Sequence, residues 1–282
     1  MEMKCRLLAD GFDWVIALDA AECGAASCGT VLLALWFYEA EADCIAGEAW
    51  IHPYYYASQQ AYRAAEKAAR ESEGQWQLRD DIRLKPIFAR LPGFSQGRNT
   101  LSYVKNVGSR FHVQTLLTEQ RLPVDVHLTH EAQPLQCDTC QRCMEACPTG
   151  AIDELGYHRE KCLRNWMMSG KPIPENMRQM GNRLLGCDDC QRCCPHNPVP
   201  KGKSYPPIPL KALLESCKEE TEALRPIIGS NMAIPNRVLS QACLVAGCSG
   251  RMELAESLTR LCSHPSLAVA EHAAWALKKM KK

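Results

Sequence analysis

Apolar positions in the first part of the chain follow patterns that predict strands. The stretch GFDWVIALDA (11–20) alternates between apolar and polar residues and predicts a strand. The stretch CGTVLLALWFY (28–38) is almost continuously apolar, so its periodicity leaves open a buried strand or a helix. The stretch GSRFHVQTLLTEQRLP (108–123) predicts one strand, or two short strands, ending at Pro123.

An amphipathic, Ala-rich stretch, SQQAYRAAEKAARES (58–72), predicts a helix between these strands. Ser58 is expected to be its N-cap, and Gly74 lies just beyond its end. The mixture of strands and helix predicts a first domain over 1–130 of the α/β type.

The end of the chain has a different, helical pattern. A Pro-rich linker over 195–209 precedes it, and the chain then shows helical spacing of small and aliphatic residues over 236–248, 251–263 and 266–280. Three short helices separated by turns are typical of helical repeats, so residues 201–282 are expected to form a HEAT-like domain.

The composition is unusual in one respect, since the chain contains 17 cysteines among its 282 residues. The longest apolar run, near 30–38, is too short to cross a bilayer, and the first residues do not have the pattern of a secretory leader. We therefore expect a cytoplasmic protein with no membrane partner, in which cysteines are metal ligands rather than disulfides.

The stretch CDTCQRCMEACPTGAI (137–152) contains four cysteines at the spacing C-x2-C-x2-C-x3-C, followed by proline. This is the spacing of a bacterial ferredoxin half-site, in which the fourth cysteine binds the other of two [4Fe-4S] clusters. Zinc sites instead favour paired C-x2-C units without a C-x3-C-P ending. The motif therefore predicts two clusters and requires a second half-site.

The second half-site is GCDDCQRCCPHN (186–197), interrupted by an insertion that places its remaining cysteine upstream at Cys162. The eight predicted ligands form two sets. The first set is Cys137, Cys140, Cys143 and Cys194, and the second set is Cys147, Cys162, Cys187 and Cys190. Cys193 is the alternative to Cys194, although Pro195 favours Cys194.

The remaining cysteines lack such spacing and are expected to be small buried residues, with Cys23 and Cys28 as an alternative redox pair. His158 and His196, beside the clusters, are expected to shield them or donate hydrogen bonds. Net charge is +1, but residues 60–110 carry ten Lys or Arg against five acids. That segment is either a solvated face or a surface for an anionic substrate or nucleic acid.

Taken together, these stretches resemble the epoxyqueuosine reductase family. The resemblance rests on both cysteine motifs, the isolated Cys162, the upstream GFSQGRNT (93–100) and the closing HPSLAVAEHAAWALKKM (264–280). It implies an α+β protein with an N-terminal cobalamin domain, a central two-cluster ferredoxin-like domain over 131–200 and the HEAT-like tail. It also implies reduction of epoxyqueuosine to queuosine in tRNA, with electrons from a donor such as flavodoxin or ferredoxin.

The resemblance also implies site residues, with departures from the family pattern. The family aspartate that donates a proton falls at Leu78, so Asp80 or Asp81 takes this role only after a slip of two or three residues. Corrin contacts are expected from the loop Gly97, Arg98, Asn99 and Thr100, and from Tyr56 of the Tyr54–Tyr56 run. The alternative for the loop 97–100 is a tight turn, and the alternative for Tyr56 is ordinary aromatic packing. A two-cluster electron carrier and a corrinoid-linked reductase without tRNA activity are the alternative functions.

Overall fold

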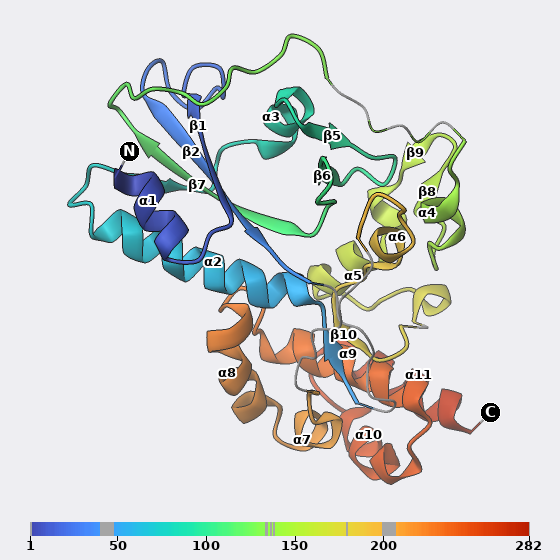
Figure 1. Ribbon diagram of the computed structural model, residues 1–282. Helices are drawn as coiled ribbons and strands as arrows, with labels where there is room; N and C mark the ends of the chain where they lie inside the picture. Colours follow the sequence, from blue (N-terminus) through green and yellow to red (C-terminus); the bar gives the residue numbers. More distant parts are fainter. Residues whose placement is uncertain are drawn as a thin grey trace. The chain divides into compact units, whose positions relative to one another are not determined.

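The computed structural model describes residues 2–39, 48–132, 135, 137, 139–178, 180–198 and 207–281 (Figure 1). The chain forms two compact units, each assembled from segments that are distant in sequence. The N-terminal unit comprises Met1–Glu39, Tyr56–Cys140 and Cys194–Val199, and the C-terminal unit comprises Ala40–Tyr55, Gln141–Cys193 and Pro200–Lys282. The three consecutive domains expected from the sequence stay a prediction.

The N-terminal unit is built on a four-stranded sheet in the order β1-β2-β7-β4. Its strands are β1 (Trp14–Asp19), β2 (Thr30–Phe37), β7 (Phe111–Thr118) and β4 (Gln77–Arg79). Every pairing in this sheet is antiparallel, with Leu33 of β2 opposite Ile16 and Thr115. This pairing corrects the expected α/β domain to α+β, because α/β domains are built on parallel strands. The mixed helix and strand content agrees with the sequence prediction.

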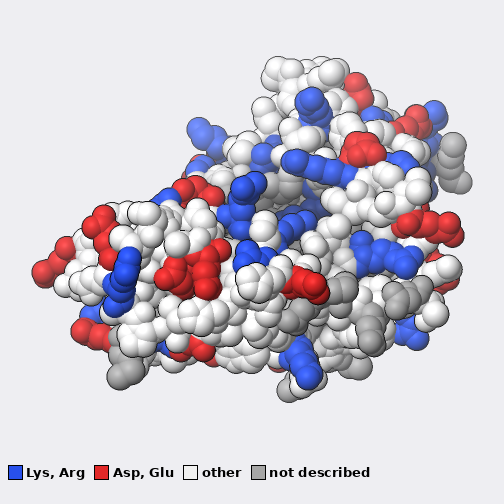
Figure 2. All heavy atoms as spheres, turned by 90° about the horizontal axis from the view of Figure 1, so that it is seen from above, with Lys and Arg blue, Asp and Glu red and all other residues white. Residues whose placement is uncertain are grey.

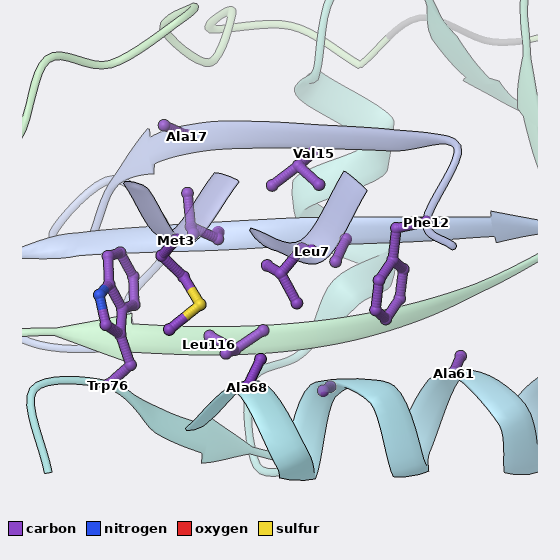
Figure 3. Packing of buried hydrophobic residues seen from close by; sticks show 12 residues of the cluster. Met3, Leu7, Phe12, Val15, Ala17, Ala61, Ala68, Trp76 and Leu116 are labelled. Atoms are coloured by element: carbon purple, nitrogen blue, oxygen red, sulfur yellow. The ribbon is translucent and has the colours of Figure 1, made fainter. Parts of the chain in front are cut away.

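Both faces of the sheet are covered, which explains the continuous apolar run of β2. Leu32 and Ala34 pack on one side with residues of α1 (Glu2–Ala9) and α2 (Pro53–Arg70), as Figure 3 shows. Leu33 and Leu35 face the opposite side, because successive side chains of a strand alternate between its faces. A strand buried on both faces needs no polar positions, so periodicity alone did not identify it.

The second face of the sheet packs against a helix and a hairpin that carry predicted site residues. Helix α3 (Leu84–Arg90) contributes Ile87 and Phe88, and the hairpin β5 (Phe94–Gln96)–β6 (Ser102–Val104) contributes Phe94 and Val104. The rings of Phe88 and Phe94 are stacked, with centroids 5.0 Å apart. This packing fixes the turn 97–101 at the edge of a rigid core.

Helix α2 begins earlier than the sequence predicts. It starts at Pro53, and Ser58 lies inside it, so the N-cap assignment of Ser58 is wrong. Proline is favoured at the first helical position, and the Nδ1 atom of His52 accepts a hydrogen bond from the Tyr54 N–H at 3.1 Å. Gly74 lies beyond the helix end as expected, with φ of 86°.

Short elements of the C-terminal unit hold the cysteine loops. Strand β3 (Trp50–Ile51) pairs in parallel with β10 (Arg183–Leu185), and β8 (Ile152–Asp153) pairs with β9 (Gly156–Tyr157). The helices here are α4 (Arg142–Glu145), α5 (Leu163–Ser169) and α6 (Asp189–Arg192). Cysteines therefore lie on turns and single helical turns, as the ferredoxin-like spacing predicts.

The rest of the C-terminal unit is helical, which confirms the three predicted helices. These are α9 (Pro235–Ser249), α10 (Ala255–Leu261), which a 3-10 turn precedes, and α11 (Leu267–Met280). Two further helices precede them, α7 (Leu210–Glu215) and α8 (Cys217–Ile228). At Gly247 a Cβ atom would lie only 2.7 Å from the Ala276 Cα, so α9 and α11 pack in close contact. Among the described residues, no helix has the length and apolar character needed to cross a membrane.

Candidate functional site

The second cysteine set lies together in the C-terminal unit. Cys187 follows β10, and Cys190 lies on α6. Burial raises the pKa of the Cys190 thiol, and the thiolates that add to this effect are those of Cys187, Cys162, Cys147 and Cys143. These electrostatic neighbours of Cys190 include the other three predicted ligands of the second set and also Cys143 of the first set, so the division into two sets stays a prediction.

Tight packing explains the glycine before Cys187. Gly186 has φ of 90°, and a Cβ atom on it would lie 2.6 Å from the His52 Cβ and 3.0 Å from the Tyr55 ring. Only glycine adopts this conformation and leaves that space open. The chain thereby turns from β10 into the cysteine loop directly against the residues that start α2.

Burial makes these thiols hard to ionise without a metal. It raises the pKa of Cys187 to about 12, with the nearby Asp189 carboxylate adding to the effect. A metal ligand must be a thiolate, so iron binding would replace several protons in this loop. The backbone N–H of Ala151 donates to the Cys147 sulfur at 3.2 Å, a contact that a thiolate strengthens.

The first cysteine set begins in the N-terminal unit. The Cys140 N–H donates to the Cys137 carbonyl at 3.1 Å, which closes the first turn of the motif. The Arg98 guanidinium donates to the same carbonyl at 3.2 Å. Cys194 belongs to this unit, and its thiol adds to the burial that raises the pKa of Tyr103. The hairpin 94–104 therefore contacts the chain at Cys137 and lies near Cys194.

The two candidates for the last ligand are placed differently. Cys194 belongs to the N-terminal unit with Cys137 and Cys140, whereas Cys193 belongs to the C-terminal unit. The Cys193 thiol donates to the Cys190 carbonyl at 3.6 Å. Cys143, the other predicted ligand of the first set, also belongs to the C-terminal unit, so the choice of Cys194 stays a prediction.

Zinc sites and four-iron clusters place their thiolates differently. Among the residues that the structure describes, no three His, Cys, Asp or Glu side chains are grouped closely enough to hold one metal ion. A tetrahedral zinc site needs its sulfurs about 2.3 Å from one atom. In a four-iron cluster each thiolate binds a different iron, so the sulfurs lie farther apart. The cysteines also remain free thiols, with no disulfide among those described.

The predicted corrin loop forms the turn of a hairpin. The Thr100 N–H donates to the Gly97 carbonyl at 2.9 Å, and Thr100 has φ of 61°. Asn99 is buried, and its side-chain amide donates to the Tyr103 hydroxyl at 2.9 Å. The Lys85 ammonium reaches the Thr100 hydroxyl at 3.3 Å. Residues 97–101 therefore form the tight turn that was the alternative interpretation of this loop. The turn places Lys85 and Arg98 at one edge of the unit.

The two candidate acids are both exposed and differ in their partners. The Arg79 guanidinium holds both carboxylate oxygens of Asp81, at 2.7 and 2.5 Å, which lowers the pKa of that carboxyl. Asp80 has no such ion pair among the described contacts, and its charge raises the pKa of Tyr62 on α2. Arg79 therefore keeps Asp81 ionised, which is unfavourable for a proton donor.

The remaining candidates pack as follows. Tyr56 is buried in the first turns of α2, and the Arg164 guanidinium lies over the Tyr54 ring at 5.5 Å. His158 lies 2.8 Å from the Asp153 carboxylate. His196 is exposed, with its ring 6.2 Å from that of Tyr103. These contacts favour packing for the tyrosines.

The alternative redox pair is not supported by its chemistry. Burial and two nearby acids raise the pKa of Cys23 to about 12, so this thiol is mostly protonated at neutral pH. Reactive thiols instead have lowered pKa values. Cys28 is an exposed free thiol.

Sequence reasoning missed three residues that contact the cysteine loops. Burial raises the pKa of the Tyr103 and Tyr157 phenols, and the neighbouring thiols of Cys194 and Cys162 respectively add to this effect. Asp188, between two predicted ligands, is 3% exposed and accepts from the Arg192 Nε at 2.6 Å. Only the position of Asp188 in the motif offered a signal, because a tyrosine has no characteristic spacing from a cysteine.

Comparison with known families confirms the cluster region. Residues 136–197 match the family model described as a 4Fe-4S double cluster binding domain. An epoxyqueuosine reductase from Alicycliphilus denitrificans is 31% identical over 210 residues, covering 64% of this chain and 55% of that protein. One from Escherichia coli is 40% identical over 106 residues, covering 36% of this chain and 26% of that protein. The chain thus aligns with about a quarter to just over half the length of these relatives.

Solved structures share the fold over nearly the whole chain. The structure of epoxyqueuosine reductase from Bacillus subtilis, with a catalytic loop swung out of the active site, has a TM-score of 0.78 at 19% identity. It is matched over 99% of this chain and 89% of that one. A crystal structure of epoxyqueuosine reductase with an epoxyqueuosine-modified tRNA-Tyr stem loop has a TM-score of 0.73 at 17% identity, covering 100% and 90%.

Proposed function

We propose that this chain, which is similar to the epoxyqueuosine reductases, is an iron–sulfur oxidoreductase that reduces epoxyqueuosine to queuosine in tRNA. The observation that carries the proposal is the match of residues 136–197 to a 4Fe-4S double cluster binding domain, a region that contains Cys147, Cys162, Cys187 and Cys190. With the first set, Cys137, Cys140, Cys143 and Cys194, these residues would hold two [4Fe-4S] clusters. Such clusters, when bound, supply single electrons at low potential.

The hairpin loop is the proposed contact of a cobalamin with the N-terminal unit. Lys85 and Arg98 offer cationic donors beside Thr100, and these suit the amide and phosphate groups around a corrin. Gly97 and Thr100 add backbone groups of the turn, whereas the Asn99 amide is engaged with Tyr103. Tyr56 is the weakest of the predicted contacts, since it is buried in α2. Cobalamin, when bound, would supply a strongly reducing cobalt.

Asp80 is the proposed proton donor of the two candidate acids. Arg79 stabilises the ionised form of Asp81 through two hydrogen bonds and lowers the pKa of that carboxyl, which is unfavourable for a proton donor. Asp80 lies next to it, is exposed and has no ion pair with Arg79 among the described contacts, so its carboxyl is accessible to a substrate.

The proposed partners are tRNA and a small electron donor such as flavodoxin or ferredoxin. Exposed cations of the 60–110 segment support an anionic partner: Arg63, Arg70, Arg83, Lys85 and Lys105. Figure 2 shows Lys and Arg common on the face it draws, with Asp and Glu among them. A relative has been crystallised with an epoxyqueuosine-modified stem loop. Helices α7–α11 are proposed as a HEAT-like tail over 201–282, beside a ferredoxin-like domain at 131–200, in a cytoplasmic enzyme.

A two-cluster electron carrier, or a corrinoid-linked reductase without tRNA activity, is the second candidate. The observation that favours it is the ionised Asp81 together with the absence of an aspartate at Leu78, where the family places its acid. Both alternatives keep the clusters and lose the reaction on tRNA.

One series of measurements separates these functions. We would reconstitute the protein anaerobically, add cob(II)alamin, remove the excess and record the EPR spectrum. We would then assay conversion of epoxyqueuosine in a modified stem loop by wild type, Asp80→Asn and Asp81→Asn. Retained cobalt and conversion that falls at least about 100-fold in Asp80→Asn but less than about threefold in Asp81→Asn would support the proposal. Intact clusters without conversion would move the electron-carrier function ahead.

A further inference from the structure

The two cysteine motifs repeat the same seven-residue pattern with a single change of charge. The first motif reads CDTCQRC over 137–143, and the second reads CDDCQRC over 187–193. Cysteine, aspartate, glutamine and arginine occupy the same positions in both motifs. Only the third position differs, with Thr139 in the first motif and Asp189 in the second. The second motif therefore carries one more negative charge than the first.

The Asp189 side chain places this extra carboxylate against a predicted ligand. The Cys187 thiol donates to the Asp189 Oδ2 atom at 3.5 Å. The Arg183 guanidinium, on β10, donates to the other oxygen, Oδ1, and such charge-assisted contacts hold a carboxylate in a fixed orientation. The Asp189 side chain is 20% exposed, so solvent screens its charge only in part. All three residues belong to the C-terminal unit.

The arginine paired with Asp189 does not cancel the negative charge at the sulfur. The carboxylate contacts the Cys187 sulfur directly, whereas the Arg183 guanidinium binds the carboxylate oxygen that does not contact the sulfur. Coulomb interactions weaken with distance, so the nearer charge has the larger effect. In agreement, the Asp189 carboxylate adds more to the burial that raises the pKa of Cys187 than the Arg183 guanidinium offsets.

A cation lies beside the first motif instead. The Arg98 guanidinium donates to the Cys137 carbonyl at 3.2 Å, and both residues belong to the N-terminal unit. Thr139, which takes the place of Asp189, is exposed and uncharged. A fixed positive charge near a cluster stabilises its reduced, more negative form, and a fixed negative charge destabilises that form. The charges beside the two motifs therefore act in opposite directions.

We propose that Asp189 and Arg98 make the two clusters unequal: the cluster of the second set has the lower reduction potential, and the first electron taken up resides on the cluster of the first set. The inference rests on the proposed function and its cluster ligands. In each step a one-electron reductant such as a reduced viologen is oxidised and one oxidised cluster gains that electron. No bond forms or breaks and no proton moves, so the fixed charges act only on the electron.

The test is an anaerobic redox titration with viologen mediators, followed by EPR, on wild type, Asp189→Asn and Thr139→Asp. Wild type should show two reduction steps whose equilibrium constants differ by at least about tenfold, which for one electron is about 59 mV. Asp189→Asn should raise the constant of the lower-potential step by about tenfold and change the other step by less than about threefold. Thr139→Asp should lower the higher-potential step by about threefold, since position 139 is exposed and screened. Coincident steps in wild type, or an Asp189→Asn shift that is below threefold or on the higher-potential step, would overturn the inference.

Two further comparisons show whether charge is the cause. Arg98→Gln loses the charge but can still donate to the Cys137 carbonyl, whereas Arg98→Lys keeps the charge. Arg98→Gln should lower the higher-potential step by about threefold, and Arg98→Lys should change it by less than about twofold. Glu222→Gln removes a carboxylate that is likewise paired with an arginine, Arg225 at 2.6 Å, but lies on α8 and should shift neither step. Equal shifts in both Arg98 variants, or a Glu222→Gln shift as large as that of Asp189→Asn, would overturn the inference.

Iron content and conversion of the modified stem loop keep this outcome distinct from failure of the proposed function. All the proteins should hold about eight irons with two EPR-active centres, and wild type with about four irons would overturn both the ligand assignment and this inference. Two unequal steps without conversion of epoxyqueuosine would overturn the proposed function and support this inference. Where Asp189→Asn loses iron, Asp189→Thr copies the first motif and should raise the same lower-potential step; no shift in that variant would overturn the inference.

Discussion

A single carboxylate, Asp188, organises the charged groups beside the second cysteine set. It is 3% exposed, and the Arg192 and His52 side chains lie 2.6 and 3.6 Å from it. These neighbours outweigh burial and lower the pKa of Asp188 to about 2. Burial also lowers the pKa of His52, so the charged pair is Asp188 with Arg192. No sequence pattern predicts the contact of Asp188 with His52, because the two residues lie more than one hundred positions apart.

The cysteines themselves were predictable, because cluster ligands need fixed spacing within a loop, and the choice between neighbouring thiols can be tested. Cys194→Ser should lose the first cluster and retain about four irons, since Cys194 is followed by proline as the fourth cysteine of a ferredoxin half-site is. Cys193→Ser should retain about eight irons. Iron analysis and EPR of both anaerobic proteins measure this, and the reverse pattern would assign Cys193 as the ligand.

Helices and strands that are determined by their own sequence pattern were predicted well. Those whose limits depend on residues distant in sequence were not. Helix α11 has a periodicity that packing on one face requires, because its buried residues recur at helical spacing. Strand β2 was ambiguous because layers from other parts of the chain cover both its faces. The start of α2 was misplaced because His52 and Pro53, rather than a hydroxyl residue, begin it.

Helix α11 carries a buried histidine that predicts a pH dependence of stability. His272 is fully buried; its Nε2 accepts from the Ile173 N–H at 2.9 Å and its Nδ1 lies 3.0 Å from the Ser240 carbonyl. Burial lowers its pKa from 6.5 to about 4. The unfolded chain therefore binds a proton first as pH falls. The stability that His272 contributes is complete above about pH 6.5 and lost toward pH 4, by about 3 kcal/mol in all.

Thermal unfolding of wild type and His272→Gln between pH 7.5 and 5.5 measures this effect. The melting temperature of wild type should fall more steeply with decreasing pH than that of the variant, with cluster absorbance recorded to confirm equal iron content. Parallel curves would show that His272 does not carry the pH dependence.

At the scale of the whole chain, the cluster region was predicted from the spacing of its cysteines, whereas the three consecutive domains stay a prediction. Consecutive domains are the simplest interpretation of a sequence, since composition changes along it. The structure instead places Cys194–Val199 with the N-terminal unit and Ala40–Tyr55 with the C-terminal unit. Each unit therefore includes segments that are distant in sequence. These segments are joined by contacts such as the Ser109–Asn197 hydrogen bond and the pairing of β3 with β10.

Removing the clusters should destabilise the segments that the second cysteine set joins. Cys147, Cys162, Cys187 and Cys190 come from three stretches with few helices or strands, so metal binding contributes directly to their folding. After chelation, amide hydrogen exchange should increase most over 141–198, while strands β1, β2 and β7 stay protected. Uniform exchange across the chain, or none, would contradict this expectation.

The distribution of thiols between surface and interior has a practical use. Among the described cysteines, Cys5, Cys28 and Cys262 are exposed, whereas the eight predicted ligands are at least partly buried. Exposed thiols react fastest with alkylating reagents, since they are accessible. Fluorescent or spin labels can therefore be attached at these three surface positions while iron occupies the ligands, which gives reporters of partner binding that do not alter the clusters.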